Sequence, residues 1–459
     1  MKMSDVIDDL RAALGNGAVL TGDDIGSKHR SDMSMTGRSL PKALIRPRDP
    51  AQVATALRIC HAHRQAVVPQ GGLTGLAGGA NAGPGDIALS LDLLSGVEEL
   101  DREAATLTVL AGTPLERAQM AAADAGFLLP LDLGSRGTAQ VGGNLATNAG
   151  GNRVIRYGMA RAQVLGLEVV LADGTILSSL NKMLKNNAGF DLKQLFIGSE
   201  GTLGIITRVV FRLKPLPRVT STAFCALESF QAVLALLQKA ERELGGPSAF
   251  EVMWPDFYRF VTEHKMTNAR PFAEEHPFNV LIEHQGLDTE NDPARFQGFL
   301  EAALEEGLLL DAMVAQNEKE AQAFWRVREG YALDTLPAIV NFDVSLAIGR
   351  IGAFVDECRS NLSKRWPGGR FFFYGHIGDS NLHITTCVDY RDGEDMHDVD
   401  EIVYRTVRDF AGSVSAEHGI GTLKRDYLGY SRTAEEIAVM RRIKTALDPQ
   451  GILNPGKVI

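Results

Sequence analysis

The segment PQGGLTGLAGG at residues 69–79 decides the fold expected for this chain, and it follows a strand-like run at residues 66–69. Glycine lets the backbone adopt positive φ and lets successive amide groups turn toward an anion, so the segment could wrap a diphosphate. Its spacing is not GxGxxG and no helical pattern follows it directly, which disfavours a Rossmann NAD site. A Walker A loop is excluded because the chain has no Gly-Lys-Ser/Thr sequence.

Two further glycine-rich segments follow, GSRGTAQVGGNLATNAGG at residues 134–151 and GSEGTLG at residues 198–204. Any one of the three could be a loop that only needs to pack tightly. Three of them in one region, mixed with Ser, Thr and Asn, instead indicate a long cofactor groove built from main-chain donors.

The pattern of expected helices and strands predicts an α+β fold with a mixed α/β first domain at residues 1–217. Asp49-Pro50 and Thr113-Pro114 each combine an N-cap residue with proline at the first helical position, so we expect helices from these points to about residues 63 and 125.

A second, substrate-covering domain is expected at residues 218–410, where strands alternate with helices and tight-turn signals are few. This alternation predicts a sheet covered by helices on one face. Residues 411–459 form a C-terminal segment that is largely helical.

Composition excludes several classes of protein. The chain has 459 residues, of which 45% are hydrophobic, so it is long enough for more than one core. The net charge of −10 and the lack of a basic block make a nucleic-acid partner unexpected. No apolar run reaches the roughly 18 residues of a membrane span, and the N-terminus lacks a signal-peptide pattern. The widely spaced cysteines read as reduced thiols, and we expect a cytoplasmic protein.

The segment GHIGDSNLH at residues 375–383, with Glu417-His418 further along, carries the chemistry. A hairpin here can place His376 and His383 at the two ends of a turn, facing one point. Two imidazoles and the Glu417 carboxylate form a ligand set for zinc or another divalent ion such as manganese or cobalt, with positions left open for substrate. His418 is then a candidate base. The alternative is two ordinary histidines and an ordinary Glu-His pair.

Six segments in order resemble one family, the FAD-linked D-2-hydroxy acid dehydrogenases. They are PQGGLTGLAGG, DLGSRGTAQVGGNLATNAGGNRVIRYG, IGSEGTLGIIT, YGHIGDSNLHI, SAEHGIGTLKRDYL and DPQGILNPGKVI. The family includes D-lactate and D-2-hydroxyglutarate dehydrogenases and the glycolate oxidase large subunit, within the vanillyl-alcohol-oxidase/PCMH flavoprotein superfamily. The resemblance implies a PCMH-type FAD-binding domain, an α/β cap domain, and a C-terminal segment that returns to the flavin.

The resemblance also implies which residues bind FAD. The first loop would hold the pyrophosphate, the second segment would line the flavin and adenosine region, and the remaining positions would lie near adenine and flavin. These positions are Gly71, Gly72, Thr74, Gly75, Gly79, Gly134, Ser135, Gly142, Asn144, Thr147, Asn148, Gly151, Gly201, Ile206 and Asn454. Family members usually have Asn at the position of Leu73. The first loop has no His or Cys where relatives attach flavin covalently, so we expect non-covalent FAD.

For the chemistry, the resemblance assigns His376, His383 and Glu417 as metal ligands and His418 as the base. Arg328 falls where the family has an arginine that binds the substrate carboxylate. The D-2-hydroxyglutarate branch carries Thr, Lys and Asn where this chain has Ala332, Asn341 and Thr385. Because a distal carboxylate would lose a cation at Asn341, a monocarboxylic substrate, lactate-like or with a larger apolar side chain, is favoured over 2-hydroxyglutarate.

The expected activity is oxidation of a D-2-hydroxy acid to the 2-oxo acid, with hydride passing to flavin N5. The electron acceptor (electron-transfer flavoprotein, quinone or cytochrome) stays open, and a homodimer is expected by analogy. Two other functions remain as alternatives: a redox-neutral flavin-dependent transferase, and a subunit of a glycolate-oxidase-like complex.

Overall fold

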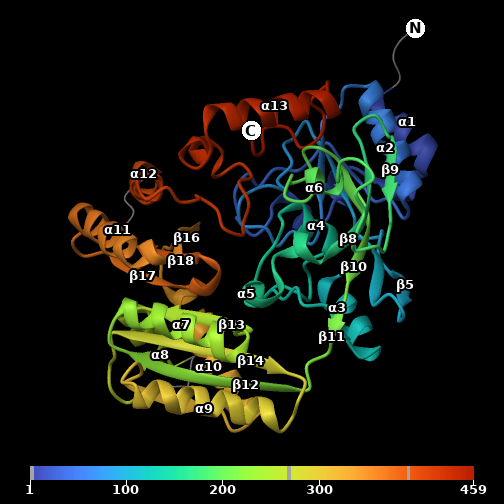
Figure 1. Ribbon diagram of the computed structural model, residues 1–459. Helices are drawn as coiled ribbons and strands as arrows, with labels where there is room; N and C mark the ends of the chain where they lie inside the picture. The colour runs from blue at the N-terminus through green and yellow to red at the C-terminus, as the bar shows by residue number, and fades with distance from the viewer. Residues whose placement is uncertain (1–4, 266–269, 390–392) are drawn as a thin grey trace. The chain divides into compact units, whose positions relative to one another are not determined.

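The computed structural model describes residues 5–265, 270–389 and 393–459 and divides into two compact units (Figure 1). Unit 1 consists of Met1–Gly151, Gly158–Leu216 and Glu417–Ile459, and unit 2 consists of Asn152–Tyr157 and Pro217–Ala416. Both units are discontinuous in sequence, whereas the sequence predicted three continuous segments, 1–217, 218–410 and 411–459. The class is α+β, as predicted.

The first part of unit 1 is a four-stranded sheet that positions the first glycine-rich loop. Its order is β1 (Val19–Leu20), β2 (Ala43–Ile45), β4 (Ile87–Ser90) and β3 (Val67–Gln70), and β2 and β3 run parallel to β4. Helix α2 (Pro50–Ala62) connects β2 to β3 and begins as predicted, with the Asp49 side chain accepting a hydrogen bond from the Gln52 amide. Because β3 ends at Gln70, the glycines start where the sheet ends.

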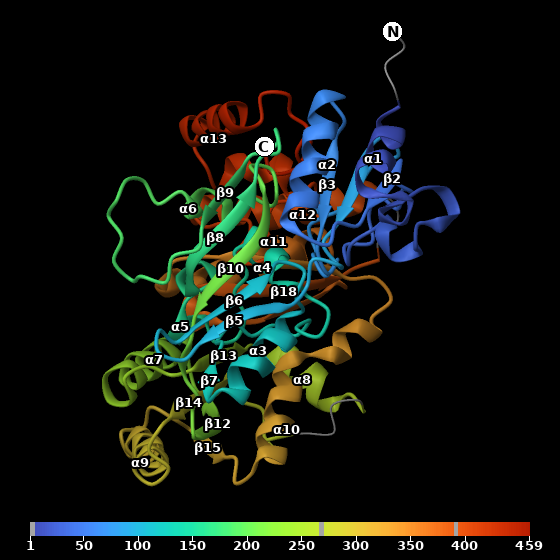
Figure 2. The ribbon, with the colours of Figure 1, turned by 90° about the vertical axis from the view of Figure 1, so that its right-hand side faces the viewer.

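The second part of unit 1 is a five-stranded antiparallel sheet (Figure 2). Its order is β5 (Val97–Asp101), β6 (Thr106–Leu110), β10 (Ile205–Arg212), β8 (Val164–Val170) and β9 (Ile176–Ser179). Helices α3 (Leu115–Asp124) and α4 (Val141–Ala146) lie between β6 and β8 in the chain. The predicted Thr113 N-cap was wrong, because the Thr113 hydroxyl donates to the Leu110 carbonyl at 2.6 Å and α3 begins at Leu115.

The C-terminal segment packs into unit 1. Helix α13 (Ala434–Leu447) begins with a capping box formed by Thr433 and Glu436. Near its end, the Lys444 ammonium donates to the Thr202 carbonyl at 2.7 Å and to the Leu453 carbonyl at 2.8 Å. One side chain therefore ties the third glycine-rich segment to the chain terminus.

Unit 2 is built on a seven-stranded antiparallel sheet. Its order is β15 (Asp311–Val314), β12 (Val219–Leu227), β14 (Phe278–Gly286), β13 (Ala249–Met253), β17 (Arg370–Gly375), β18 (Asn381–Cys387) and β16 (Val340–Ser345). The helices are α7 (Phe230–Leu244), α8 (Pro255–Glu263), α9 (Asn291–Glu305), α10 (Glu318–Glu329), α11 (Ile351–Arg365) and α12 (Gly393–Asp409).

Helices lie on both faces of this sheet, so the expectation of one covered face was wrong. Figure 2 shows α7 and α9 on one side of β12 and β14, with α8 and α10 on the other side. Side chains of α8 and α10 share one core with Phe224, Met253 and Phe372. These strands are buried on both faces, so their sequences are nearly continuous apolar runs without the alternation of a half-exposed strand.

Strand register gathers polar side chains on the α8 and α10 face of the sheet. His383 is paired with Tyr374 and with Asp343, and Thr385 is paired with Phe372 and Asn341. Directly opposed residues point to the same face of a sheet. We call this surface, carried by Glu251, Asn341, Asp343, His383 and Thr385, the polar face of unit 2. Among the residues that the structure describes, no helix is both long and apolar enough to span a bilayer.

Candidate active site

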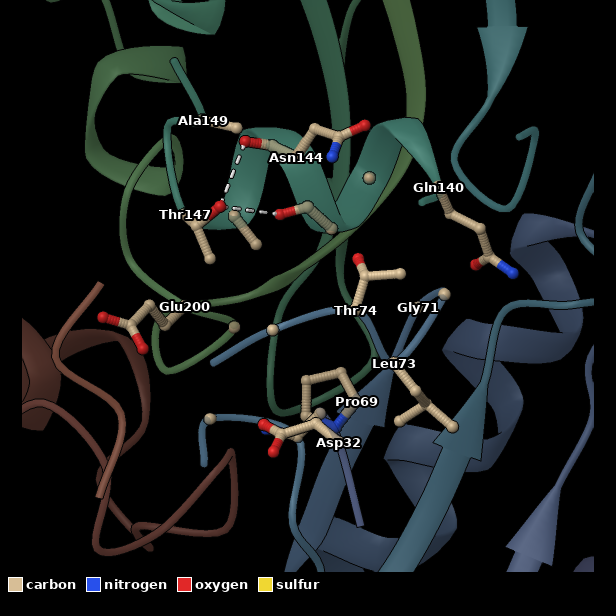
Figure 3. Close-up of a pocket in the computed structure, with 18 of the residues that line it drawn as sticks. Asp32, Pro69, Gly71, Leu73, Thr74, Gln140, Asn144, Thr147, Ala149 and Glu200 are labelled. Atoms are coloured by element: carbon tan, nitrogen blue, oxygen red, sulfur yellow. Dashed lines mark hydrogen bonds between the residues drawn. The ribbon is translucent and has the colours of Figure 1, made fainter. Parts of the chain in front are cut away.

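A pocket in unit 1 collects side chains and backbone from all three glycine-rich segments (Figure 3). Most of the residues that the sequence assigned to FAD line it: Gly71, Gly72, Thr74, Gly75, Gly79, Gly134, Ser135, Gly142, Asn144, Thr147, Gly201 and Ile206. Glu417 and His418 line the same pocket. Segments more than 300 positions apart in the chain therefore share one cavity of unit 1.

Two of the glycines are required by close packing. A Cβ on Gly72 would lie 2.1 Å from the Thr138 carbonyl oxygen, and one on Gly142 would lie 2.7 Å from the Ala111 Cβ. The neighbouring atoms belong to other segments of the chain, so the absence of a side chain at these two glycines lets the segments pack closely. The remaining space in the cavity is left to a ligand.

Leu73 also lines the pocket, and its backbone has a φ of 59°. Asparagine tolerates this left-handed conformation better than leucine does. The conformation would suit asparagine, the residue that the resemblance led us to expect at this position.

The pocket wall contains buried polar atoms that have no partner in the protein. The carbonyl oxygens Gln140 Oε1 and Asn144 Oδ1 accept no hydrogen bond, although these residues are only 7% and 6% exposed. Buried polar atoms are normally hydrogen-bonded, so two orphaned acceptors in one pocket fit a ligand that carries N–H or O–H groups. FAD, with its hydroxyls and ring N–H groups, matches that requirement.

The orientation of the Gln140 amide is fixed by a hydrogen bond to Asp92. Its Nε2 donates to Asp92 Oδ1 at 2.9 Å, and the other carboxylate oxygen accepts from the Lys28 ammonium at 2.6 Å. Burial by itself would raise the pKa of Asp92, but Lys28 and Gln140 outweigh it and lower that pKa. Because the ionised carboxylate only accepts, Oε1 is the atom left for the pocket. Gln140 is not among the residues predicted for the site, although it lies inside the second segment.

Glu200 and Asn454 hold the loops around the pocket. The buried Glu200 carboxylate accepts from the Ile420 amide at 2.6 Å and the Gly421 amide at 2.9 Å. Burial raises the pKa of this carboxyl despite those donors. Asn454 does not line the pocket; its amide donates to the carbonyls of Gly79 and Glu200 at 3.0 and 2.7 Å. Its contacts join the first and third glycine-rich segments.

Two other predicted FAD residues also lie outside the pocket lining. Asn148 has a φ of 50° and accepts a hydrogen bond from the Arg161 amide at 2.9 Å. Gly151 has a φ of 112°, and its amide donates to Glu417 Oε1 at 2.8 Å. Both residues stabilise the turn that ends the second segment. A family motif contains residues with such structural roles as well as residues that contact the ligand, and the motif alone does not distinguish them.

In unit 2, the predicted histidines lie side by side. His376 follows β17, His383 lies in β18, and Ser380 makes the turn with a φ of 76°. The two ring centroids are 5.1 Å apart and the rings are nearly perpendicular, at 78°. Because His376 is two residues beyond Tyr374, the cross-strand partner of His383, both rings lie toward the polar face.

Arg328 joins the histidines from α10. It is 6% exposed, its Nε donates to Glu251 Oε2 at 2.5 Å, and its Nη2 lies 3.3 Å from His376 Nε2. Arg328 therefore forms a buried ion pair with Glu251 and not a pair on the surface of α10. Its guanidinium carbon also lies 5.1 Å from the centroid of the Tyr374 ring, a cation–π distance.

Glu251 is a site residue that the sequence did not predict. It is fully buried in β13 and also contacts His376, whose Nδ1 lies 2.6 Å from its Oε1. Burial alone would raise the pKa of Glu251, but Arg328 and His376 lower it to about 2. The available signal was a single carboxylate inside the apolar strand AFEVM. A buried charge needs a partner, but nothing local identifies which one.

Asn341 and Thr385 lie further along the polar face and contact each other. The Thr385 hydroxyl donates to Asn341 Oδ1 at 2.7 Å and lies 3.5 Å from the Tyr374 hydroxyl. Ala332, the third position that departs from the 2-hydroxyglutarate branch, is fully buried. Ala332, Asn341 and Thr385 all have uncharged side chains.

Comparison with known proteins agrees with this architecture. A family model described as FAD linked oxidases, C-terminal domain, matches residues 216–458, and one described as FAD binding domain matches residues 41–179. The mitochondrial D-2-hydroxyglutarate dehydrogenase of Bos taurus is 40% identical over 447 residues, covering 96% of this chain and 81% of the relative. D-2-hydroxyglutarate dehydrogenase of Xanthomonas citri pv. viticola is 40% identical over 429 residues, covering 91% and 89%.

A crystal structure of p-cresol methylhydroxylase with substrate bound has a TM-score of 0.79 at 16% identity, covering 99% of this chain and 96% of that one. The fold is therefore that of a PCMH-type flavoprotein. Within that class, the chain belongs to the FAD-linked D-2-hydroxy acid dehydrogenases, as the sequence predicted, and it is an FAD-dependent oxidoreductase that acts on a CH–OH group.

Proposed function

We propose that this enzyme oxidises a monocarboxylic D-2-hydroxy acid, with Arg328 binding the carboxylate next to two imidazoles. The observation that carries the proposal is the Arg328 guanidinium, whose Nη2 is 3.3 Å from His376 Nε2 on the polar face. A 2-hydroxy acid carries its carboxylate and hydroxyl on adjacent carbons, so both groups can meet neighbouring protein groups. A guanidinium binds carboxylates in a planar, directional way.

We propose a divalent metal, zinc or alternatively manganese or cobalt, held by His376 and His383 with Glu417 as third ligand. Support comes from the adjacent imidazole rings and from the chain path. The amide of Ala416 donates to Asp343 Oδ2 at 3.0 Å, and Asp343 is the strand neighbour of His383. Glu417 is the next residue. An ion bound there would lower the pKa of the substrate hydroxyl.

His418 is the proposed base that accepts the hydroxyl proton. It follows Glu417 directly and lines the flavin pocket of unit 1. Bound FAD would supply the hydride acceptor. The residues of this chain would then bind the carboxylate, orient the hydroxyl and remove its proton, while the pocket wall keeps water from the reacting carbon.

The preference for a monocarboxylate rests on two uncharged residues of the polar face, Asn341 and Thr385. Asn341 and Thr385 hydrogen-bond to each other, so neither offers a charge to a second carboxylate. The next cation along this face of β17 is Arg370, about 7 Å along the strand from Phe372, the strand partner of Thr385. Its guanidinium lies 5.6 Å from the centroid of the Phe260 ring. A distal carboxylate beside Asn341 would therefore have to draw Arg370 away from Phe260, because neither Asn341 nor Thr385 supplies a cation.

A second candidate is D-2-hydroxyglutarate, because the relatives from Bos taurus and Xanthomonas citri are named for that substrate. Anaerobic flavin bleaching decides between the two. Purified protein is mixed with D-2-hydroxyglutarate and with a series of D- and L-2-hydroxy monocarboxylates, with and without EDTA. We expect stereospecific bleaching that is fastest with a D-monocarboxylate and lost after metal removal.

Faster bleaching by D-2-hydroxyglutarate would transfer the assignment to the second candidate. Bleaching that resists prolonged chelation would remove the metal from the proposal while leaving the dehydrogenase intact. A holoenzyme bleached by neither class of acid would contradict the proposed substrates.

The remaining predictions extend this proposal. FAD is proposed to be non-covalent: the pocket lining of unit 1 contains no Cys or Tyr among the described residues, and its one His is the proposed base. Denaturing the protein should therefore release all the yellow colour into the supernatant. A homodimer, a cytoplasmic location and an acceptor such as electron-transfer flavoprotein, quinone or cytochrome stay predictions from the sequence.

A further inference from the structure

Glu251 uses its two carboxylate oxygens for two different site residues. Oε2 accepts from Arg328 Nε at 2.5 Å, and Oε1 lies 2.6 Å from His376 Nδ1. Its side chain is completely buried in β13, at the centre of the sheet of unit 2. The proposed carboxylate binder and a proposed metal ligand are thus held by one group that is itself buried from solvent.

The contact with Glu251 fixes the tautomer of His376. A carboxylate only accepts hydrogen bonds, so Nδ1 must carry the proton and Nε2 must present its lone pair. Carboxylates in this position behind a metal-ligating imidazole orient the ring and increase its basicity. Nε2 can therefore offer its lone pair to a metal ion or to a hydrogen-bond donor.

The same carboxylate also fixes Arg328. Donation from Nε to Glu251 and the 3.3 Å approach of Nη2 to His376 set the plane of the guanidinium. Within the described part of the chain, no hydrogen bond uses Nη1, so the outer edge of the fork remains for a ligand carboxylate. The separation between the cation and the imidazole is consequently determined by Glu251 and not by the flexible arginine stem.

We propose that Glu251 is a positioning residue that holds Arg328 and His376 at one separation, and that this separation selects acids whose hydroxyl is on the carbon next to the carboxylate. In a 3-hydroxy acid one further C–C bond of about 1.5 Å separates the two groups. Such an acid would not place both groups correctly between a fixed guanidinium and a fixed imidazole. The inference rests on the proposed roles of Arg328 and His376.

The test compares Glu251→Gln with Glu283→Gln. Glu283 is also buried, at 3% exposed; it pairs with Arg153 and accepts from the Trp325 indole at 3.2 Å, without contact to Arg328 or His376. Both variants replace a buried, paired carboxylate in neighbouring strands by an isosteric amide. Glu283→Gln therefore reports the cost of losing a buried ion pair at a carboxylate that contacts neither Arg328 nor His376.

We expect Glu251→Gln to lower kcat/KM for the best 2-hydroxy acid by about 10–100-fold relative to Glu283→Gln, with FAD content unchanged. The ratio of kcat/KM for the 2-hydroxy acid to that for its 3-hydroxy isomer should fall as well. A buried residue with only a structural role would lower both activities together and leave the ratio unchanged. Equal behaviour of the two Gln variants, or an unchanged ratio, would overturn the proposal.

A second readout does not depend on activity. In metal-free protein labelled with ¹⁵N-histidine, NMR should show His376 protonated at Nδ1, and Glu251→Gln should move the proton to Nε2. Glutamine keeps one acceptor oxygen for the two partners of Glu251, so with its carbonyl accepting from Arg328 Nε its NH2 group donates to Nδ1. Wild-type protein with the proton already on Nε2 would overturn the proposal.

Two additional variants separate the possible failures. Arg328→Ala and His376→Ala test the proposed function directly, and wild-type turnover in both would reject that function itself. Large losses in these two, combined with identical Glu251→Gln and Glu283→Gln enzymes, would reject only the role of Glu251. If Glu251→Gln does not fold, Glu251→Asp answers the same question, because a shorter carboxylate keeps the charge but cannot reach both partners.

Discussion

The flavin pocket of unit 1 and the polar face of unit 2 are built from different kinds of groups. The pocket is lined mainly by backbone, glycines and neutral side chains, with Asp32, Glu200, Glu417 and His418 as its ionisable groups. Its closest contacts are made by the glycines with neighbouring segments. The polar face is an array of charged and ionisable side chains in which one carboxylate contacts an arginine and a histidine. The pocket is therefore sensitive to the addition of a single methyl group, whereas the polar face is sensitive to the position of a charge or a proton.

The largest expected effect is the loss of flavin from unit 1. Gly72→Ala places a Cβ 2.1 Å from the Thr138 carbonyl, so the first two glycine-rich segments must separate. We expect purified Gly72→Ala to be nearly colourless and to have almost no turnover, measured by the absorbance ratio of flavin to protein. Gly85→Ala is the matched control in unit 1, since a Cβ there meets nothing within 4 Å. A yellow Gly72→Ala protein would show that the loop contact does not set the pocket.

Removing a proposed metal ligand in unit 2 should lower turnover strongly without lowering the amount of bound flavin. We expect His383→Ala to lower kcat by about 10³-fold, since metal activation contributes several kcal/mol. The bound FAD per chain should stay at the wild-type value. His264→Ala, a unit 2 histidine next to Phe260, is the control and should retain activity. Loss of FAD from His383→Ala would contradict the separation of tasks between the two regions.

Replacing the planar guanidinium of Arg328 by an ammonium group, which keeps the positive charge, should have the next largest effect. Arg328→Lys keeps the cation but cannot hold Glu251 through Nε while offering a second edge to substrate. Loss of a hydrogen bond to a charged group costs about 1.5–3 kcal/mol, so kcat/KM should fall about 10–100-fold. Most of the change should appear in KM. An unchanged KM would mean that Arg328 does not bind the substrate carboxylate.

A neutral hydrogen bond in the pocket should matter less. Gln140→Leu removes the orphaned acceptor, and a neutral hydrogen bond is worth about 0.5–1.5 kcal/mol. We therefore expect the Kd for FAD to rise by about 3–10-fold, measured by quenching of flavin fluorescence on titration of apoprotein. Gln119→Leu, whose amide donates to the Leu131 carbonyl, serves as control. Equal affinities would mean that Oε1 does not face the cofactor.

The smallest expected effect is a shift in substrate preference. Asn341 is exposed, so a lysine there stays partly in water, where an ion pair contributes about 0.2–1 kcal/mol. Asn341→Lys should raise kcat/KM for D-2-hydroxyglutarate relative to a monocarboxylate by only a few-fold, and raised ionic strength should reduce the gain. A ratio that moves the other way would show that the distal carboxylate does not approach Asn341.

Local pattern was sufficient for most elements. Strand β3 and helix α2 were predicted, because an apolar run precedes the first glycine-rich segment and Asp49-Pro50 marks a helix start. Helix α8 was missed although proline starts it, because its segment is short and preceded by a strand of similar composition. Helix cover on both sheet faces was also missed. Apolar runs show that a strand is buried, but not which helix buries each side.

The glycine-rich segments, the histidine pair and the family could be recognised from the chain alone, because backbone loops and a hairpin are local features. Glu251, Arg328 and His376 belong to three elements that only the seven-stranded sheet and α10 bring together. Likewise, the role of Gln140 depends on Asp92 and Lys28, which come from separate segments. The sequence thus determined which chemistry is present. The tertiary structure decided which proton and which charge meet, because long-range contacts between buried polar groups leave no periodicity in the chain.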